Sequence, residues 1–381
     1  MNAIGQLGGL GGLGGLGGLG GLGGLGGLGG LGGLGGLGGL GGLGGLGGVA
    51  GISPFFAEAM TKNRDALVGL YNSADLLNPP MKAIDEISNL KSWTNEVRLQ
   101  VCQAELYAPL SFTTDALTNS AGLQHLEKTG VLGQFQAENI VKMTRPMQAL
   151  FIQQLELVMN WASLREDRTS EVLAQATNSA PFWMTILNLQ PHRHKYTIEL
   201  LILVQSFAMH VEMRLKHAFA CPRPAEYSSQ VQPMIATPGH GSWPSGHSTE
   251  AFMTARVLQC FLDVSLVSEI NIQLQRLAAR VAINRTVAGV HFPVDSAAGR
   301  LLGESLAGYF VHRCKAQPNY KERSFDGTQF HDGGNALDFN YHAPLNNTST
   351  SSFNTEGAVH TLNSPSAILK TLWDLAKAEW Q

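Results

Sequence analysis

The hydrophobic positions of this chain follow two different patterns, one before and one after about residue 50. From Leu7 to Leu46 a leucine recurs at every third position with two glycines between. This spacing matches neither the 3.6-residue period of an α-helix nor the two-residue period of a strand, and ordering so many glycines costs conformational entropy. We therefore expect residues 1–51 to be a disordered low-complexity segment. The alternative is an extended helix with three residues per turn, which would present a stripe of leucines for self-association or for a membrane surface.

Beyond the repeat, apolar residues recur at the spacing of amphipathic helices. Ser53-Pro54 has the form of a helix start, and the helices expected from there to about Gln190 are broken at Pro79-Pro80, Pro109 and Pro181. Four further helices are expected near residues 194–219, 251–261, 266–282 and 293–314. The stretch from residue 316 to about Ser364 is rich in Asn and Ser and predicts a surface loop or a mobile tail, before a short amphipathic helix closes the chain.

These patterns predict an all-α chain in three parts. Residues 1–51 are the repeat, residues 52–315 form a helical domain, and residues 316–381 form a polar tail with a C-terminal helix. The residues outside the repeat number about 330, enough to form one large domain or two small ones. Within the helical domain, the chemical half is expected at residues 194–315.

Composition excludes several classes of partner and site. The 381 residues carry a formal net charge of −3, which gives no basic field of the kind that nucleic acid or anionic lipid requires. The N-terminus lacks the features of a secretory signal, and the most apolar later stretch, residues 198–211, falls short of the roughly 18 apolar residues of a membrane span. We therefore expect a cytoplasmic protein without a transmembrane helix. Its cysteines lack the close pairing of a zinc site or a disulfide scaffold and are expected to be reduced thiols: Cys102, Cys221, Cys260 and Cys314.

Residues that carry chemistry concentrate in the second half of the chain, and the first cluster is a pair of cations. Lys216 and Arg223 lie seven positions apart, the first near the end of a predicted helix and the second between two prolines that stiffen the chain. Taken alone, this pair is equally consistent with an ordinary solvated helix terminus, where cations are favoured.

The second cluster is Pro244-Ser245-Gly246-His247, which precedes a predicted helix. Unpaired backbone N–H groups and the helix dipole converge at such a terminus, so an oxyanion is the natural ligand there. Glycine allows the backbone to approach that ligand closely. Taken alone, the four residues are also consistent with a helix-capping turn.

The third cluster combines Arg285, His291 and Asp295. A histidine and an aspartate four residues apart can meet on one helical face, so Asp295 can accept the Nδ1 proton and leave Nε2 of His291 free as a nucleophile or ligand. A lone pair of this kind is also consistent with a structural hydrogen bond. Gly299 and Gly303, further along the same helix, are expected to allow close helix packing.

Together the three clusters resemble the pattern of the type 2 phosphatidic-acid phosphatase and vanadium haloperoxidase superfamily. That pattern is Lys, six residues, Arg-Pro; then Pro-Ser-Gly-His; then Ser-Arg, three residues, Gly, one residue, His, three residues, Asp. One position departs from it, because Asn284 stands where the family usually has Ser, and this puts in doubt the hydrogen bond of that serine. The resemblance covers about residues 196–314 and implies a helical bundle of the acid phosphatase and haloperoxidase type, with the clusters meeting at one end.

The resemblance also implies a role for each matching residue. His291 is the nucleophile that takes a phosphoryl group, or the single protein ligand to vanadium if vanadate is bound, and Asp295 orients it. His247 protonates the leaving oxygen and then serves as the base for the attacking water. The remaining groups hold the equatorial oxygens: Lys216, Arg223, Arg285, the Ser245 hydroxyl and the Gly246 amide.

Three functions fit these residues. The first is a metal-independent phosphatase without a cofactor, which hydrolyses a phosphomonoester through a phosphohistidine intermediate and acts on a lipid phosphate if the repeat seeks membranes. The second is a vanadium-dependent haloperoxidase, with vanadate as cofactor and halide and hydrogen peroxide as substrates. The third is an assembly protein whose repeat forms a homo-oligomer and whose domain only binds phosphate. The intact His247, His291 and Asp295 argue against the third.

Overall fold

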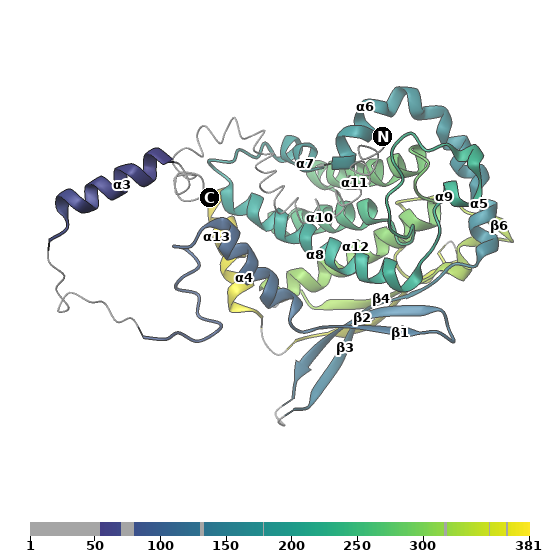
Figure 1. The fold of residues 1–381 in the computed structure, drawn as a ribbon. Helices are drawn as coiled ribbons and strands as arrows, with labels where there is room; N and C mark the ends of the chain where they lie inside the picture. The colour runs from purple at the N-terminus through teal and green to yellow at the C-terminus, as the bar shows by residue number, and fades with distance from the viewer. Residues whose placement is uncertain are drawn as a thin grey trace, which may run out of the picture. The chain divides into compact units, whose positions relative to one another are not determined.

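The computed structural model describes residues 54–69, 80–129, 133–177, 179–315, 318–349, 351–362 and 365–381 (Figure 1). The chain divides into two compact units, Met1–Lys82 and Ala83–Gln381. In the first unit, helix α3 (Pro54–Leu67) has its described side chains exposed. The expectation for the Gly-Gly-Leu repeat lies outside the described residues, and the domain boundaries expected at residues 51 and 315 stay predictions.

The second unit contains the helices that carry the three sequence clusters. The α-helices are α4 (Asn95–Tyr107), α5 (Gln148–Trp161), α6 (Arg165–Thr177), α7 (Ala180–Leu187), α8 (Lys195–Phe219), α9 (Pro224–Tyr227), α10 (Gly246–Leu262), α11 (Glu269–Val287), α12 (Pro293–Lys315) and α13 (Ala367–Lys377). Single 3₁₀ turns lie at Ala162–Leu164, Ser229–Val231, Gly327–Gln329 and Ala378–Trp380. The predicted helices of the chemical half correspond to α8, α10, α11 and α12, so the helical periodicity was informative there.

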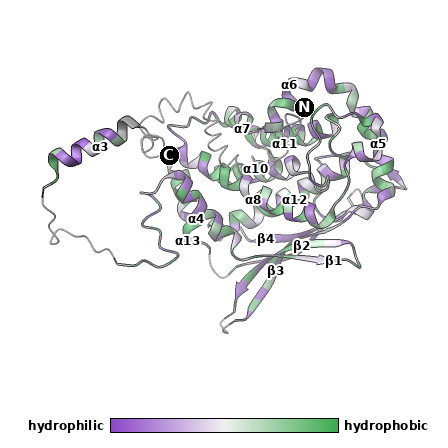
Figure 2. Cartoon of the chain, viewed as in Figure 1, coloured by the Kyte–Doolittle hydropathy of each residue, from purple (hydrophilic) through white to green (hydrophobic). Residues whose placement is uncertain are grey.

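Helix α10 lies at the centre of the helical part and packs against α8, α11 and α12. Hydrophobic residues are frequent along these helices (Figure 2), and most of them are buried. A Cβ at Gly299 would lie 2.5 Å from the Ser245 carbonyl oxygen, and a Cβ at Gly303 would lie 2.5 Å from the Thr249 carbonyl oxygen. The two glycines therefore bring α12 against the first turns of α10, which confirms the predicted close packing.

The second unit also contains a five-stranded mixed sheet, so the all-α prediction is wrong. Its strands, in sheet order, are β1 (Leu110–Asp115), β2 (Ser120–Lys128), β3 (Phe135–Thr144), β4 (Tyr320–Asp326) and β7 (Asn354–His360). The β3–β4 pair is parallel and the other pairs are antiparallel. Two short strands, β5 (His331–Asp332) and β6 (Asn335–Ala336), form a separate pair.

The error in the fold class has a physical origin in two segments. Residues 110–144 were assigned to helices between prolines but form a three-stranded meander with a turn at Asn119, which has a φ of 48°. Residues 316–364 were expected to be a loop or tail, yet they supply β4 and β7. Because β4 pairs in parallel with β3, a strand far away in sequence, no hairpin signal in the local sequence marks this pairing.

The sheet packs against the helices that position the site. Strands β3 and β4 contact α12, and β2 contacts α8, with the sheet below these helices in the view of Figure 1. On this interface His125 Nδ1 lies 2.8 Å from the Tyr309 hydroxyl, which also accepts a hydrogen bond from Arg313 Nη1 at 3.0 Å. Among the described helices, none combines the length and hydrophobicity that crossing a membrane would require.

Candidate active site

Lys216 comes from the last turn of α8 and is buried. The helix ends at Phe219, because Ala220 adopts a left-handed conformation with a φ of 46° and Pro222 follows shortly after. Lys216 is only 1% exposed, and its Nζ donates to the carbonyl oxygens of Gly241 and Ser242, both at 3.1 Å. The reading of this lysine as part of a solvated helix terminus is therefore wrong. Burial lowers the pKa of Lys216 to about 8, and Glu212 opposes that shift.

Arg223 precedes α9 and connects three segments of the site. Its Nη1 donates to the Val290 carbonyl oxygen at 2.7 Å and to His291 Nε2 at 3.2 Å, and its Nε donates to the His240 carbonyl oxygen at 3.0 Å. Its side chain is buried like that of Lys216. Burial lowers the pKa of Arg223 to about 10, so the guanidinium is still a cation at neutral pH.

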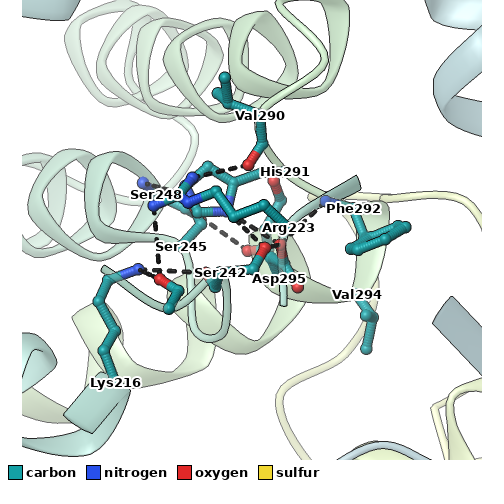
Figure 3. Close-up of polar contacts among 12 residues, drawn as sticks. Lys216, Arg223, Ser242, Ser245, Ser248, Val290, His291, Phe292, Val294 and Asp295 are labelled. Atoms are coloured by element: carbon teal, nitrogen blue, oxygen red, sulfur yellow. Dashed lines mark hydrogen bonds and ion pairs between the residues drawn. The ribbon is translucent and has the colours of Figure 1, made fainter. Parts of the chain in front are cut away.

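His291 lies between Arg223 and Asp295, with one ring nitrogen facing each (Figure 3). Its Nδ1 lies 2.9 Å from Asp295 Oδ2, and its Nε2 faces the guanidinium of Arg223. A guanidinium can only donate, so Nε2 accepts, and the ring proton lies on Nδ1 facing the carboxylate. Burial, followed by the positive charge of Arg223, lowers the pKa of His291 well below its usual value, so the ring is neutral and Nε2 carries a lone pair.

Asp295 lies in the first turn of α12, and one of its carboxylate oxygens accepts three hydrogen bonds. Oδ2 accepts from His291 Nδ1, from the Phe292 backbone N–H at 2.9 Å and from the Ser242 hydroxyl. Its Oδ1 is buried and without a partner. Burial raises the pKa of Asp295 to about 6, opposed by the Ser242 and Phe292 hydrogen bonds. Asp295 is therefore mostly ionised at neutral pH and fixes the orientation of the His291 ring.

The Ser245-Gly246-His247 turn opens α10, as predicted. Ser245 is the N-cap: its hydroxyl accepts from the Ser248 N–H at 3.4 Å, and its own N–H donates to the Asp295 carbonyl oxygen at 2.9 Å. At Gly246 a Cβ would overlap the buried Glu212 carboxyl group, so a larger residue would require that side chain to move. The start of α10 is thereby fixed to the start of α12.

His247 lies on the wall of the site formed by α6. Its Nε2 is 3.2 Å from the Gln175 carbonyl oxygen, and since a carbonyl only accepts, Nε2 carries the proton and Nδ1 carries the lone pair. Burial, followed by the positive charge of Arg285, lowers the pKa of His247 to about 3. Burial and the cations of the site therefore both favour the neutral ring.

Arg285, on α11, has donors that are buried and unused. One nitrogen, Nη2, donates to the Val172 carbonyl oxygen at 3.0 Å, whereas Nε and Nη1 are buried with no partner. The side chain is 1% exposed. Leaving charged donors buried and unpaired is costly, so these two nitrogens mark a place where an anion would be stabilised.

Asn284, at the position where the resemblance expects serine, joins α11 to α6. Its Nδ2 donates to Glu171 Oε1 at 2.9 Å and to Gln175 Oε1 at 2.8 Å, and its Oδ1 accepts from Arg168 Nη1 at 3.0 Å. The same Gln175 holds His247 through its backbone carbonyl. The asparagine thus positions the wall of the site behind His247.

Two acidic residues near the cations were missed by the sequence analysis. Glu212 is 4% exposed, its Oε2 has no partner, and burial followed by the charge of Glu250 raises its pKa well above the usual value. Burial raises the pKa of Glu250 to about 7, opposed by Lys216 and Arg285. Their positions were a usable signal, because Glu212 precedes Lys216 by one helical turn and Glu250 follows His247 by three residues.

The predicted site residues come together in space. Lys216, Arg223, His291 and Asp295 share one hydrogen-bonded region with Ser242, which the sequence analysis did not single out (Figure 3). The second group, His247 and Arg285, is close enough that Arg285 shifts the pKa of His247 and His247 shifts that of His291. The three clusters therefore form one electrostatically coupled site.

Comparison with known proteins is consistent with this geometry. Residues 196–318, which contain all three clusters, match the family model of the PAP2 superfamily. The resemblance inferred from the three motifs is thereby confirmed. A similar solved structure is "Crystal structure of the first transmembrane PAP2 type phosphatidylglycerolphosphate phosphatase from Bacillus subtilis", with 23% sequence identity, a TM-score of 0.34, and coverage of 42% of this chain and 84% of that chain. The search of curated proteins found no match to this chain.

Proposed function

We propose that this chain is a phosphatase that hydrolyses a phosphomonoester through a phosphohistidine on His291 Nε2. The match of residues 196–318 to the PAP2 superfamily model supports phosphatase activity, and a phosphatase of this kind is expected to use no cofactor. The observation that carries the mechanism is the state of His291, whose Nδ1–H faces Asp295 and whose Nε2 lone pair faces the guanidinium of Arg223. A neutral ring held in this tautomer by a carboxylate is the form required of a nitrogen nucleophile.

In the first chemical step, the Nε2 lone pair of His291 forms a bond to phosphorus while the bond from phosphorus to the ester oxygen breaks. The leaving oxygen takes a proton from His247, which yields the alcohol and a phosphorylated His291. The Nδ1–H of His291 stays with Asp295, whose negative charge offsets the positive charge that the ring acquires.

In the second step, water attacks phosphorus and the bond from phosphorus to Nε2 breaks. His247 takes the proton of the water, inorganic phosphate leaves, and both histidines return to their starting forms. His247 needs a higher pKa for this cycle than the value of about 3 that it has beside unneutralised cations. A bound phosphate raises the pKa of His247, because its negative charge offsets Arg285, Lys216 and Arg223, which lower that pKa in addition to burial.

The cations of the site supply the electrostatic stabilisation. Phosphate-monoester hydrolysis is among the slowest uncatalysed reactions, with accelerations of up to ~10²¹-fold in the extreme case. Each placed donor contributes on the order of 3–4 kcal/mol at a developing oxyanion. Three positive charges come from Lys216, Arg223 and Arg285. The Nε and Nη1 nitrogens of Arg285 have no partner and are available to donate to a bound phosphate. We propose that these charges allow the reaction without a divalent metal.

The test is turnover of p-nitrophenyl phosphate together with trapping of the intermediate. We expect vanadate-inhibited release of p-nitrophenol, and acid-labile, base-stable phosphate on the wild-type chain but not on the His291→Ala variant. Asp295→Ala should lose turnover as well, whereas the exposed His342→Ala should not.

Two results would overturn the proposal. One is halide oxidation that requires both vanadate and hydrogen peroxide in place of ester hydrolysis, which would identify the haloperoxidase alternative. The other is phosphate binding without turnover of aryl or lipid phosphates, which would favour the assembly protein.

A further inference from the structure

A cavity lies on the side of α12 away from the candidate active site. It has a volume of about 320 Å³ and is lined by α12 and by residues between 330 and 354. Small-molecule pockets typically measure about 300–1,000 Å³, so this cavity is large enough for a compact ligand. None of the residues assigned to the active site lines it.

The periodicity of α12 separates the two sites. Ala297 and Arg300 line the cavity and lie three residues apart, on one face of the helix. Asp295 precedes Ala297 by two residues, which corresponds to a rotation of about 200° around the axis. A ligand in the cavity would therefore contact the face of α12 opposite to the one that carries Asp295.

Arg300 gives the cavity a cation without a paired carboxylate. Its Nη1 donates to the Ala343 carbonyl oxygen at 2.8 Å, and its guanidinium carbon lies 5.7 Å from the centre of the Phe252 ring. Its Nε is buried with no partner, and no carboxylate among the described residues forms an ion pair with it. Burial lowers the pKa of Arg300 from its usual value, but not far enough for an arginine to lose its charge.

An acidic residue, Asp338, also lines the cavity and forms no ion pair with Arg300. Both carboxylate oxygens of Asp338 are already used, Oδ2 by Trp161 Nε1 at 2.9 Å and Oδ1 by the Phe339 N–H at 2.7 Å. Asp338 itself is exposed. Arg300 forms no ion pair with Asp338, and the charge of Glu304 acts on it without forming an ion pair, so its guanidinium is available to an anion that enters the cavity.

Three phenylalanines and the buried Asn354 are among the other lining residues. Phe330 and Phe353 stand edge to face with ring centres 4.8 Å apart, and Phe339 lines the cavity as well. Asn354 is 2% exposed and donates from Nδ2 to the Pro344 carbonyl oxygen at 2.7 Å, but its Oδ1 is buried and without a partner. Aromatic rings favour a flat apolar group, and the amide oxygen favours a hydroxyl or N–H on it.

We propose that this cavity is a binding site for a small hydroxylated aromatic carboxylate. Its carboxylate would pair with Arg300, its ring would lie among Phe330, Phe339 and Phe353, and its hydroxyl would donate to Asn354. A single guanidinium matches the single charge of a carboxylate, whereas the active site offers three cations to a phosphate. The site is independent of the proposed phosphatase activity.

Isothermal titration of the full chain with 4-hydroxyphenylacetate tests the proposal, with 4-hydroxyphenylacetamide and phenylacetate as matched probes. All titrations contain enough inorganic phosphate to saturate the active site. We expect saturable binding of one 4-hydroxyphenylacetate per chain, at least tenfold weaker binding of the amide, and severalfold weaker binding of phenylacetate. Arg300→Gln should weaken binding of the acid at least tenfold, and Arg276→Gln, at an exposed position of α11, should not change it.

Three results would overturn the proposal: no saturable binding of the acid, equal binding of acid and amide, or full affinity in a folded Arg300→Gln variant. Displacement of the acid by rising phosphate concentration would also overturn it, because the probe would then occupy the active site. If circular dichroism shows that Arg300→Gln does not fold, the proposal is tested by the wild-type chain alone. It then stands or falls on whether the acid binds more tightly than the amide.

Discussion

Arg223 Nη1 lies 3.2 Å from His291 Nε2, the nitrogen that would attack phosphorus. Since Nε2 must accept from the guanidinium, this contact keeps the imidazole proton on the nitrogen that faces Asp295. The same guanidinium also donates to two backbone carbonyl oxygens, those of Val290 and His240. Arg223 therefore holds both the ring and the loops around it, and a bound phosphate would compete with His291 for one of its donors.

Replacing Arg223 with lysine tests this arrangement. Lysine keeps the charge but loses the planar fork of donors, so we expect kcat/KM for p-nitrophenyl phosphate to fall on the order of 10²–10³-fold. The exposed Arg276→Lys substitution is the control and should leave the rate unchanged. A rate within threefold of wild type would show that charge alone is sufficient at this position.

Asp295→Asn tests the orientation of the nucleophile. The amide has the shape of the carboxylate but lacks its charge, so it neither fixes the Nδ1–H tautomer nor offsets a phosphorylated ring. We expect kcat to fall on the order of 10²–10⁴-fold, with little change in the affinity for inorganic phosphate as an inhibitor. If kcat and the affinity for inorganic phosphate fell by the same factor, the substitution would have disrupted the whole site and not only the orientation of His291.

The activity should depend on pH through the carboxyl groups of Glu212 and Glu250. Glu250, whose pKa is raised to about 7, is protonated below that value and ionises as pH rises through it. Ionisation adds a negative charge beside Lys216 and Arg285, so we expect KM to increase above pH 7. Glu250→Gln removes that charge and should keep KM low to higher pH, and Glu212→Gln should act in the same direction because the pKa of Glu212 is also raised.

The control for this comparison is Glu156→Gln, an exposed change on α5 that should retain the wild-type profile. All variants are assayed with the same substrate, so protonation of the substrate itself affects every KM profile equally. Superimposable profiles of KM against pH for wild type and both site variants would contradict the prediction.

Asn284→Ser introduces the residue that the family pattern expects and should be harmful in this chain. Serine cannot reproduce the contacts with Glu171, Gln175 and Arg168, and it leaves buried polar groups unpaired. We expect the free energy of unfolding to fall by about 1–3 kcal/mol in urea denaturation. Because Gln175 positions His247, kcat should fall as well. An exposed change of the same kind, Asn160→Ser on α5, should alter neither quantity.

Deleting residues 316–381 tests whether the C-terminal part belongs to the folded unit. The deletion removes β4, β7 and α13, which contact β3, α12, α8 and α4. We expect the shortened chain to lose cooperative thermal unfolding and all turnover. A shortened chain that unfolds cooperatively with wild-type activity would show that residues 316–381 are a separate tail.

The sequence was most informative where structure and chemistry are both local. The apolar periodicity predicted α8, α10, α11 and α12, and the spacing of His291 and Asp295 anticipated their hydrogen bond. The positions of the cations could be predicted from the family pattern, but their burial could not. Whether Lys216 faces solvent depends on the loop at Gly241 and Ser242, which closes over it from a distant part of the chain.

The features that escaped prediction depend on pairings between distant segments. The role of Asn284 requires α6, and nothing in the local sequence of Glu171 or Gln175 points to α11. The β3–β4 pairing was missed for the same reason, since Val141 pairs with Arg323 across the whole helical segment. The β1–β2–β3 meander is an exception, because its pairings are local and its strands lie in a segment expected to be helical. Pairings between distant segments are encoded by complementarity between surfaces, which a single sequence does not display.

The parallel pairing of β3 with β4 also determines when this protein can finish folding as it is made. Strands β1, β2 and β3 emerge from the ribosome first. All the helices of the active site are synthesised after them and before β4 emerges. During that interval β3 has an open edge, and open edges invite pairing with other chains. Nascent chains of this protein are therefore expected to depend on chaperones until the last strands have been synthesised.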